Sequence, residues 1–186
     1  AGFQNTSREY RDNYPLTFKS INKSAEVLNK LKISDKIYSV QGILFQDSGY
    51  DGVPNVRQVG LYSNLVYLSG KNLNFSLGGR INNHQTYGNF LTYSLNPSYN
   101  FYFKESQNIK IFTTLNSAFI APSLYQLYDS YSGNENLLPE ESISKEIGIE
   151  TINKKRNLSI VFFERKENPK IIYEYNFSTF TGGYIN

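Results

Sequence analysis

The stretch Asn72–Phe103, which reads NLNFSLGGRINNHQTYGNFLTYSLNPSYNFYF, decides the fold class. Apolar and polar side chains alternate through Asn72–Asn82 and again through Asn89–Phe103. Because successive side chains of a strand point to opposite faces, this alternation predicts two strands that each have one apolar and one largely polar face. Both exceed the usual strand length in soluble domains, about 5–6 residues, and can provide the about 9–11 residues of a membrane strand. We expect the apolar side chains to face lipid and the following side chains to face the other way: Asn74, Ser76, Thr92, Ser94 and Asn96.

The same pattern, followed outward along the chain, predicts an all-β protein built as an antiparallel meander of hairpins. Further strands are expected at 18–28, 36–46, 57–68, 109–119, 142–152 and 157–173, and another begins at Tyr184. The segment 18–28 also suits a short amphipathic helix, and the strand 157–173 is expected to bend near Pro169. Residues 1–17 are polar and aperiodic and predict a loop. The total is about eight strands and part of another.

The connections between these strands are expected to alternate in length. One set is long or aromatic and comprises 1–17, 47–56, 83–88, 120–141 and 175–183. The other set is short and polar and comprises 29–35, 69–71, 104–108 and 153–156. Bacterial outer-membrane barrels have long extracellular loops and short periplasmic turns. This alternation therefore favours a segment of a transmembrane β-barrel, with the long set at the cell surface.

The composition excludes several classes of protein. No run approaches the roughly 18 apolar residues of a membrane helix, and the mean hydropathy is −0.47. Cysteine is absent, so there are no disulfides and no thiolate sites, and a net charge of +3 with interspersed signs does not indicate a nucleic-acid partner. The first residues lack the basic and apolar regions of a signal peptide. We expect no signal peptide and no plug domain in this chain, and we place residues 1–186 in one barrel domain.

The longest predicted loop carries the most specific sequence signal. Ala118–Glu150 reads AFIAPSLYQLYDSYSGNENLLPEESISKEIGIE. Its central part has no strand or helix period, and Pro122 and Pro139 have no N–H to offer a ladder. Long loops without secondary structure are uncommon in compact domains and are usually functional or disordered. Three tyrosines and four leucines favour the functional reading over disorder.

Three segments of this stretch resemble the barrel signature of a known family. They are Phe119-x-Ala121-Pro122-Ser123-Leu124-Tyr125-x-Leu127-Tyr128, then Gly133-Asn134-x-x-Leu137-x-Pro139-Glu140-x-Ser142, then Glu146-x-Gly148-x-Glu150. The order and spacing are similar to those of TonB-dependent outer-membrane receptors, and most similar to the cobalamin-receptor (BtuB-like) branch. The chain departs from the pattern at Ile120, where these receptors often have a basic residue, and at Glu135, where proline usually follows Gly-Asn.

The resemblance implies a location in the bacterial outer membrane and a role in importing a scarce nutrient too large for porins. The corrinoid class is favoured as the ligand, and an iron siderophore is the second choice. Surface loops would bind the nutrient, and the TonB inner-membrane energy-coupling complex would act through a plug. Outer-membrane lipid is a further expected partner, and no cofactor is expected. Since such receptors are plugged barrels of about 22 strands, we expect the chain to be an internal fragment of a larger receptor.

Candidate site residues fall into two groups. Aromatic side chains of two predicted loops are the candidates for ligand contact, because tyrosine combines a rigid apolar face with a hydroxyl group: Tyr125, Tyr128, Tyr131, Tyr175, Phe177 and Phe180. The alternative is that they pack at the barrel rim or join its aromatic girdle. Arg80, Glu146 and Glu150 lie on polar strand faces and are candidates for facing the lumen and the plug, with a solvated charge as the alternative.

Catalysis has little support in the sequence. His84 is the only histidine, and it is expected to be an exposed turn residue without the partners of a metal site or a catalytic triad. Glu140 and Glu141 are adjacent on a strand, so their side chains point to opposite faces and do not form an acid–base pair. We therefore expect neither an enzyme nor a metal site. The alternative function is a soluble β-sandwich or glycan-binding module with aromatic loops.

Overall fold

The chain forms one large antiparallel sheet and one small hairpin. The computed structural model describes residues 1–186 except 12–16, 51, 71, 104–106 and 154–155. The sheet contains β1 (Gly2–Arg11), β2 (Thr17–Lys32), β3 (Ile37–Tyr50), β4 (Val53–Leu68), β5 (Leu73–His84), β6 (Gly88–Phe103), β7 (Gln107–Ile120), β8 (Glu140–Asn153) and β9 (Asn157–Glu167), paired in chain order. The hairpin is formed by β10 (Ile172–Asn176) and β11 (Thr181–Ile185), and the short helix α1 (Leu124–Tyr128) lies between β7 and β8.

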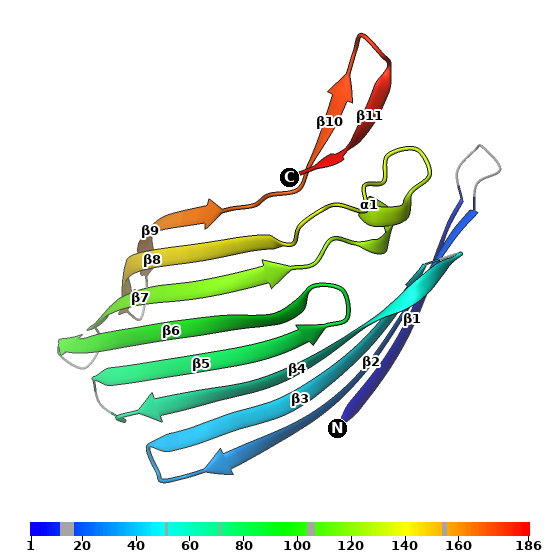
Figure 1. Ribbon diagram of the computed structural model, residues 1–186. Coiled ribbons are helices and arrows are strands. Elements are labelled where there is room, and N and C mark those ends of the chain that lie inside the picture. The colour runs from blue at the N-terminus through cyan, green and yellow to red at the C-terminus, as the bar shows by residue number, and fades with distance from the viewer. Residues whose placement is uncertain (12–16, 51, 71, 104–106, 154–155) are drawn as a thin grey trace.

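The sheet curves like part of a barrel wall, and its connections lie at two opposite ends (Figure 1). One end carries the segments 33–36 and 69–70, while the other carries 85–87, α1 and the β10–β11 hairpin. The expected all-β antiparallel meander is thereby confirmed. Within the described part of the chain, no helix is long and apolar enough to cross a membrane.

The sheet has an outer face that is apolar and exposed. A row of aliphatic side chains crosses five neighbouring strands at matched register: Val27, Ile43, Leu61, Ile81 and Leu91. Between 43% and 68% of the surface of each is exposed. Such a surface is unstable in water but suits the hydrocarbon of a bilayer. The predicted apolar alternation of β5 and β6 is found in this face.

A β-sandwich would bury its apolar faces between two packed sheets. In the described part of the chain nine strands form a single sheet, and the second sheet is the two-stranded β10–β11 hairpin. The alternative reading as a sandwich is therefore wrong. The physical reason is that the apolar side chains alternate toward the exposed outer face and not toward a second sheet.

The opposite, inner face is polar, and long side chains lie across its glycines. The Tyr62 ring covers Gly42 and the Arg80 guanidinium covers Gly60, so that a Cβ atom on either glycine would collide with them. The Tyr62 hydroxyl donates to Glu26 Oε1 at 2.8 Å. Arg80 Nε donates to Asn82 Oδ1 at 2.6 Å. The first hydrogen bond links β4 to β2 across Gly42 of β3, and the second lies within β5. Both are on the face that a barrel encloses.

Several predicted boundaries were wrong at the end of the sheet that carries α1. Residues 2–11 form β1, which pairs with β2 from Gly2–Glu26 to Arg11–Thr17. The predicted loop 47–56 is mostly strand, with Gly52 at φ 75° beside the turn, and the predicted loop 83–88 shortens to 85–87, followed by Gly88 at φ 76°. Glycine adopts this left-handed region without a steric penalty, so tight turns replace long loops.

Of the long connections predicted at this end of the sheet, the connection between β7 and β8, residues 121–139, is the longest that the structure describes. The predicted alternation of long and short connections depends mainly on it. The helix alternative for 18–28 is also wrong, since β2 covers it, and β9 ends before Pro169 instead of bending there. The predicted loop 175–183 is largely the β10–β11 hairpin. The predicted short turns 69–71, 104–108 and 153–156 fall partly outside the described residues.

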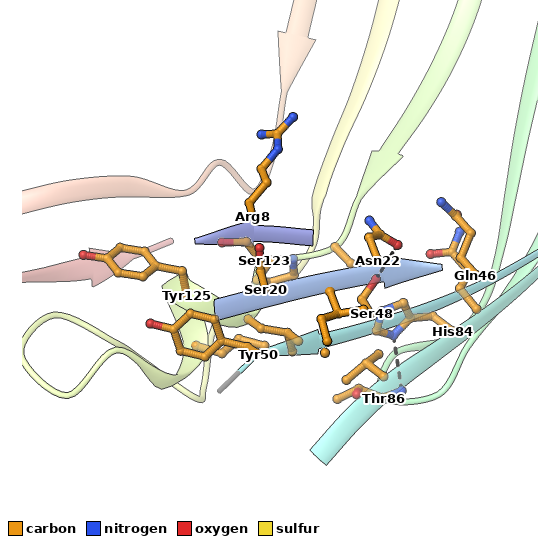
Figure 2. A pocket seen from close by; sticks show the side chains of 18 of the residues that line it. Arg8, Ser20, Asn22, Gln46, Ser48, Tyr50, His84, Thr86, Ser123 and Tyr125 are labelled. Carbon is orange, nitrogen blue, oxygen red and sulfur yellow. Dashed lines mark hydrogen bonds between the residues drawn. The ribbon is translucent and has the colours of Figure 1, made fainter. Parts of the chain in front are cut away.

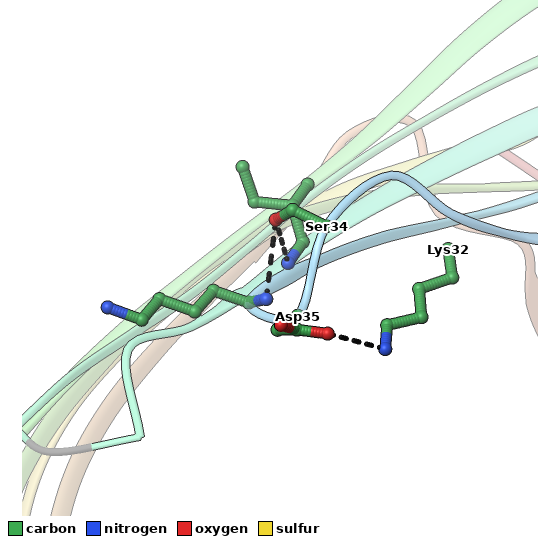
Figure 3. A network of polar contacts seen from close by, with 5 residues as sticks. Lys32, Ser34 and Asp35 are labelled. Atoms are coloured by element: carbon green, nitrogen blue, oxygen red, sulfur yellow. Dashed lines mark hydrogen bonds and ion pairs between the residues drawn. The ribbon is translucent and has the colours of Figure 1, made fainter.

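The turn between β2 and β3 shows how side chains close the connections of this sheet (Figure 3). Ser34 Oγ accepts from the backbone N–H groups of Lys36 at 3.3 Å and Ile37 at 3.2 Å. A side-chain acceptor that binds the N–H groups two and three residues ahead mimics a backbone turn. Lys32 Nζ also pairs with Asp35 Oδ1 at 2.7 Å, but both side chains are exposed, so water screens this pair and it contributes little.

Candidate ligand site at the loop end of the sheet

The connection between β7 and β8, residues 121–139, is folded and not irregular, and we call it the cap loop. It contains α1, whose first turn is closed by a capping box: Gln126 N donates to Ser123 Oγ at 3.2 Å, and Ser123 N donates to Gln126 Oε1 at 2.9 Å. The sequence pattern predicted no secondary structure here. The pattern Ser-x-x-Gln directly after Pro122 is a helix-start signal that could have revealed α1.

The cap loop has a small core of its own. Leu127 and Leu137 have exposures of 5% and 2%, and they are the buried aliphatic side chains among the described residues. Asp129 Oδ2 accepts from Ser132 Oγ at 2.6 Å and from Ser132 N at 3.0 Å. A Cβ atom on Gly133 would lie 2.5 Å from the Asp129 carbonyl oxygen, so only glycine fits there. Gly133 of the family motif therefore shapes the loop.

The β10–β11 hairpin is fastened to the cap loop by hydrogen bonds. Tyr184 N donates to the Ser132 carbonyl at 3.1 Å, and Asn134 Nδ2 donates to the Tyr184 carbonyl at 2.8 Å. Asn186 Oδ1 accepts from Leu138 N at 2.6 Å, while its Nδ2 donates to the Leu138 carbonyl at 3.1 Å. Cap loop and hairpin are therefore joined by hydrogen bonds, one between backbone groups and the others between asparagine side chains and the backbone.

A series of tyrosine rings runs from the sheet through the cap loop to the hairpin. The Tyr125 ring lies edge-on to Tyr50 and to Tyr184, with centroid distances of 6.3 Å in both cases. Tyr184 lies edge-on to Tyr173 at 5.2 Å. Burial, followed by the nearby hydroxyls of Tyr125 and Tyr173 and by Asp129, raises the pKa of Tyr184. Its hydroxyl is therefore neutral at physiological pH.

Beneath the cap loop lies a cavity of about 1230 Å³ (Figure 2). Its walls come from the inner face of β1 to β5 and from the start of the cap loop, and include Ser20, Asn22, Gln46, Ser48, Gln58 and His84. Tyr50 and Tyr125 stand together at one side. Arg8 and Glu9 are the charged residues among the described lining residues, and they carry opposite charges. The cavity therefore offers neutral hydrogen-bonding groups beside aromatic faces.

The predicted loop candidates do not all reach this cavity. Tyr125 lines it. Tyr128 does not line it but lies close enough to Tyr87 to affect its hydroxyl, and Tyr131 is 78% exposed on the cap loop. The hairpin residues Tyr175, Phe177 and Phe180 also lie away from the cavity lining, with exposures of 42%, 79% and 78%.

The charged candidates lie on the inner face but outside the cavity lining. Arg80 crosses Gly60, and Glu150 lies 3.7 Å from Lys110, measured from Oε2 to Nζ. Glu146 shares its face with Glu150, four residues further along β8. Their contact with a plug remains a prediction.

His84 and Glu140 both make structural hydrogen bonds. His84 is only 8% exposed, so the prediction of an exposed turn histidine was wrong, because the turn folds the imidazole over the cavity wall. Glu140 Oε1 accepts from Ile171 N at 2.7 Å, which gives this carboxylate a structural partner.

Sequence reasoning missed most of the polar wall of the cavity. Asn22, Gln46 and Ser48 stand at alternate positions that share the inner face, and Asn22 Oδ1 accepts from Ser48 Oγ at 3.2 Å. The region 47–56 was predicted as a loop, so its alternation was not followed to the end of the strand. Tyr50, which faces Tyr125, was missed for the same reason.

Comparisons with known proteins agree with this geometry. The family described as TonB dependent receptor-like, beta-barrel, matches residues 2–186. The vitamin B12 transporter BtuB of Vibrio cholerae is 33% identical over 94 residues, which are 50% of this chain and 15% of the transporter. The siderophore receptor PirA of Pseudomonas aeruginosa superposes with a TM-score of 0.70 at 23% identity, covering 85% of this chain and 33% of that one.

A further solved relative has the same fold. The ferric enterobactin receptor PfeA of Pseudomonas aeruginosa, in a mutant form with enterobactin, gives a TM-score of 0.66 at 20% identity and covers 85% of this chain and 28% of the receptor. The chain thus spans about a third or less of the solved chains that it matches.

Proposed function

Since the chain belongs to the TonB-dependent receptor-like β-barrel family, we propose that it forms part of the wall and surface loops of a receptor that imports a scarce nutrient. Members of this family are bacterial outer-membrane proteins, and the exposed apolar outer face suits that location. In this proposal residues 1–186 belong to one barrel domain. The end of the sheet with the cap loop faces the cell exterior.

The observation that carries this proposal is the cavity beneath the cap loop. Its volume of about 1230 Å³ exceeds the roughly 300–1,000 Å³ of most small-molecule pockets. A large ligand with both apolar surface and polar groups matches such a cavity, because the tyrosine rings offer flat faces and the amides and hydroxyls offer hydrogen bonds. Porins do not serve nutrients of this size.

A corrinoid is the proposed ligand class, and an iron siderophore is the second candidate. Corrinoids carry peripheral amides that pair with neutral donors and acceptors such as those of Asn22, Gln46 and Gln58. Anionic siderophore complexes favour a strongly cationic site, whereas the described lining brings one cation, Arg8, to the inner face among neutral amides and hydroxyls. The similarity to a vitamin B12 transporter supports the same choice.

Uptake in this proposal needs binding and movement but no covalent chemistry, so we propose a receptor and not an enzyme. The ligand is captured outside by the cap loop and the cavity wall. The TonB energy-coupling complex then acts through a plug that lies against the inner face, where Arg80, Glu146 and Glu150 are candidate contacts. Outer-membrane lipid covers the aliphatic row of the outer face, which runs from Val27 in β2 to Leu91 in β6. The family relationship is the support for the energy-coupling partner.

The test is binding of cyanocobalamin, and in parallel of ferric enterobactin, to whole cells that express the full-length receptor. Tyr125→Ala removes a ring that lines the cavity, whereas Tyr131→Ala removes an exposed ring of the same cap loop and serves as the matched control. Since a buried aromatic contact is worth more than about 1 kcal/mol and about 1.4 kcal/mol is tenfold, we expect Tyr125→Ala to weaken binding about tenfold.

The triple variant of Tyr125, Tyr128 and Tyr131 to alanine should weaken binding at least as much. If Tyr125→Ala and Tyr131→Ala weaken binding equally, the ligand does not bind in this cavity. If neither cyanocobalamin nor ferric enterobactin binds, the proposed ligand classes are refuted.

A further inference from the structure

His84 closes the turn that follows β5 with its imidazole ring. Nδ1 accepts from the backbone N–H groups of Thr86 at 3.2 Å and Tyr87 at 3.3 Å. The ring is buried at 8% exposure and also lines the cavity. A nitrogen that accepts hydrogen bonds carries no proton, so this geometry requires neutral His84 with its single proton on Nε2.

Tyr87 connects that turn to the cap loop. Its ring lies against His84 with a centroid distance of 5.0 Å. Its hydroxyl donates to the carbonyl oxygen of Leu137 at 3.1 Å, and Leu137 is 2% exposed in the core of the cap loop. Burial raises the pKa of Tyr87, and nearby Tyr128 acts in the same direction, so the hydroxyl keeps its proton at neutral pH. The turn and the cap loop are thus linked through a single side chain.

Other turns of this protein use the same device with side chains that do not titrate. Ser34 Oγ binds the N–H groups two and three residues ahead of it. Asn176 Oδ1 accepts from Ser178 N at 2.9 Å and Thr179 N at 3.4 Å. A histidine in this role differs because its side chain can gain a proton, and in an unperturbed histidine this happens between about pH 5 and pH 8. The chain has one histidine, and it stands at the turn that contacts the cap loop.

We propose that His84 is a positioning residue for the ligand site: its neutral imidazole holds the turn 85–87, and Tyr87 in turn holds the cap loop over the cavity. Protonation puts a hydrogen on Nδ1. This nitrogen can then no longer accept the hydrogen bonds of Thr86 N–H and Tyr87 N–H, and its own hydrogen repels theirs. The ring must rotate away, the turn opens, and the Tyr87–Leu137 bond loses its anchor. The ligand-binding part of this inference rests on the proposed function, whereas the coupling of turn and loop does not.

The surroundings of His84 disfavour its charged form. Opposite it in β4 stands neutral Gln58, and opposite it in β6 stands Gly88. The remaining titratable and charged groups around it in the described structure are Tyr87 in the turn, Arg57 in β4, Arg80 on the same face of β5, and the cavity residues Arg8 and Glu9. The Arg57 side chain is directed to Asp47, at 3.7 Å. Burial of the imidazole lowers the pKa of His84, so the transition is expected on the acidic side of its ordinary range.

The first arm of the test follows the cap loop without any ligand. A nitroxide is attached to Ser130→Cys in the full-length receptor in detergent, where Ser130 is an exposed residue of the cap loop. Its spectrum is recorded between about pH 8 and pH 5. We expect the mobile component to grow as the pH falls. His84→Asn supplies an acceptor of the kind used at Asn176 and should give an ordered cap loop at every pH, while Tyr87→Phe should give the mobile spectrum at every pH.

The second arm measures binding of cyanocobalamin and ferric enterobactin over the same pH range. Acidification should weaken binding to the unmodified receptor by about threefold to tenfold, the range expected when one net hydrogen bond is lost. The affinity of the His84→Asn receptor, whatever its value at pH 8, should not change on acidification. An equal pH response of the unmodified receptor and His84→Asn in the spin-label arm would overturn the inference. Failure of both probes at every pH would refute the proposed ligands, and the spin-label arm would still decide the role of His84.

Discussion

Replacing Leu77 by arginine tests whether the outer face of the sheet lies in lipid. Leu77 is near the middle of β5, is 48% exposed, and belongs to a second aliphatic row formed by Leu65, Leu77, Leu95 and Leu115. An arginine on the lipid face of a barrel costs about 2–4 kcal/mol at the bilayer midplane. On a water-exposed surface the same change stays within about 0.5 kcal/mol. The two environments therefore predict effects that differ several-fold.

The matched control is Asn96→Arg. Asn96 follows Leu95, the register partner of Leu77, and its side chain points to the inner face at nearly the same depth. The assay is urea unfolding of the full-length receptor in phospholipid vesicles, which gives the free energy of unfolding of each variant. We expect a loss of about 2–4 kcal/mol for Leu77→Arg and a clearly smaller loss for Asn96→Arg. Equal losses, or a negligible loss for Leu77→Arg, would refute a lipid-facing outer surface.

The remaining predictions concern the cap loop and the hairpin attached to it. Gly133→Ala places a Cβ atom 2.5 Å from the Asp129 carbonyl oxygen, so it should destabilise the cap loop by about 1–3 kcal/mol. We expect faster hydrogen exchange of the amides in 121–139. Gly79→Ala is the control, because a Cβ atom there meets open space, and it should not change this exchange. The raised pKa of Tyr184 means that the folded state holds the phenol proton more tightly than the unfolded state does. The stability that the neutral Tyr184 side chain contributes is therefore complete below the ordinary pKa of 10.0 and is lost as the pH rises above that value. Exchange of the β11 amides, corrected for intrinsic rates, should therefore increase above about pH 10, and Tyr184→Phe should abolish that increase.

The sequence was most informative where one side of a strand meets a nonpolar medium. Leu77 and Leu95 alternate with polar neighbours because their faces differ in environment, so the strands, their faces and the fold class could be predicted. Above the apolar belt both faces are wet, and the alternation disappears although the backbone pairing continues. That is why β1 and the ends of β3 and β4 were taken for loops.

The candidate site was predictable only in part for a related reason. Tyr125 stands in a stretch whose motif and composition single it out, and it does line the cavity. The polar wall comes from strands far apart in the sequence, and no local pattern brings Asn22, Gln46 and His84 together. The exposed hairpin aromatics Phe177 and Phe180 look similar to Tyr125 in sequence. Only the tertiary arrangement separates them from the cavity lining.

Photo-cross-linking on intact cells tests the ligand cavity most directly. A benzophenone amino acid replaces Tyr125 in the full-length receptor, or Leu91 on the outer face as the control, and the cells are illuminated with radiolabelled cyanocobalamin or radiolabelled ferric enterobactin. We predict labelling from position 125 that excess unlabelled ligand suppresses, and none from position 91, because Tyr125 lines the cavity while Leu91 is 68% exposed on the opposite face. Ligand binding without any labelling from position 125, or with equal labelling from position 91, would contradict a ligand site beneath the cap loop.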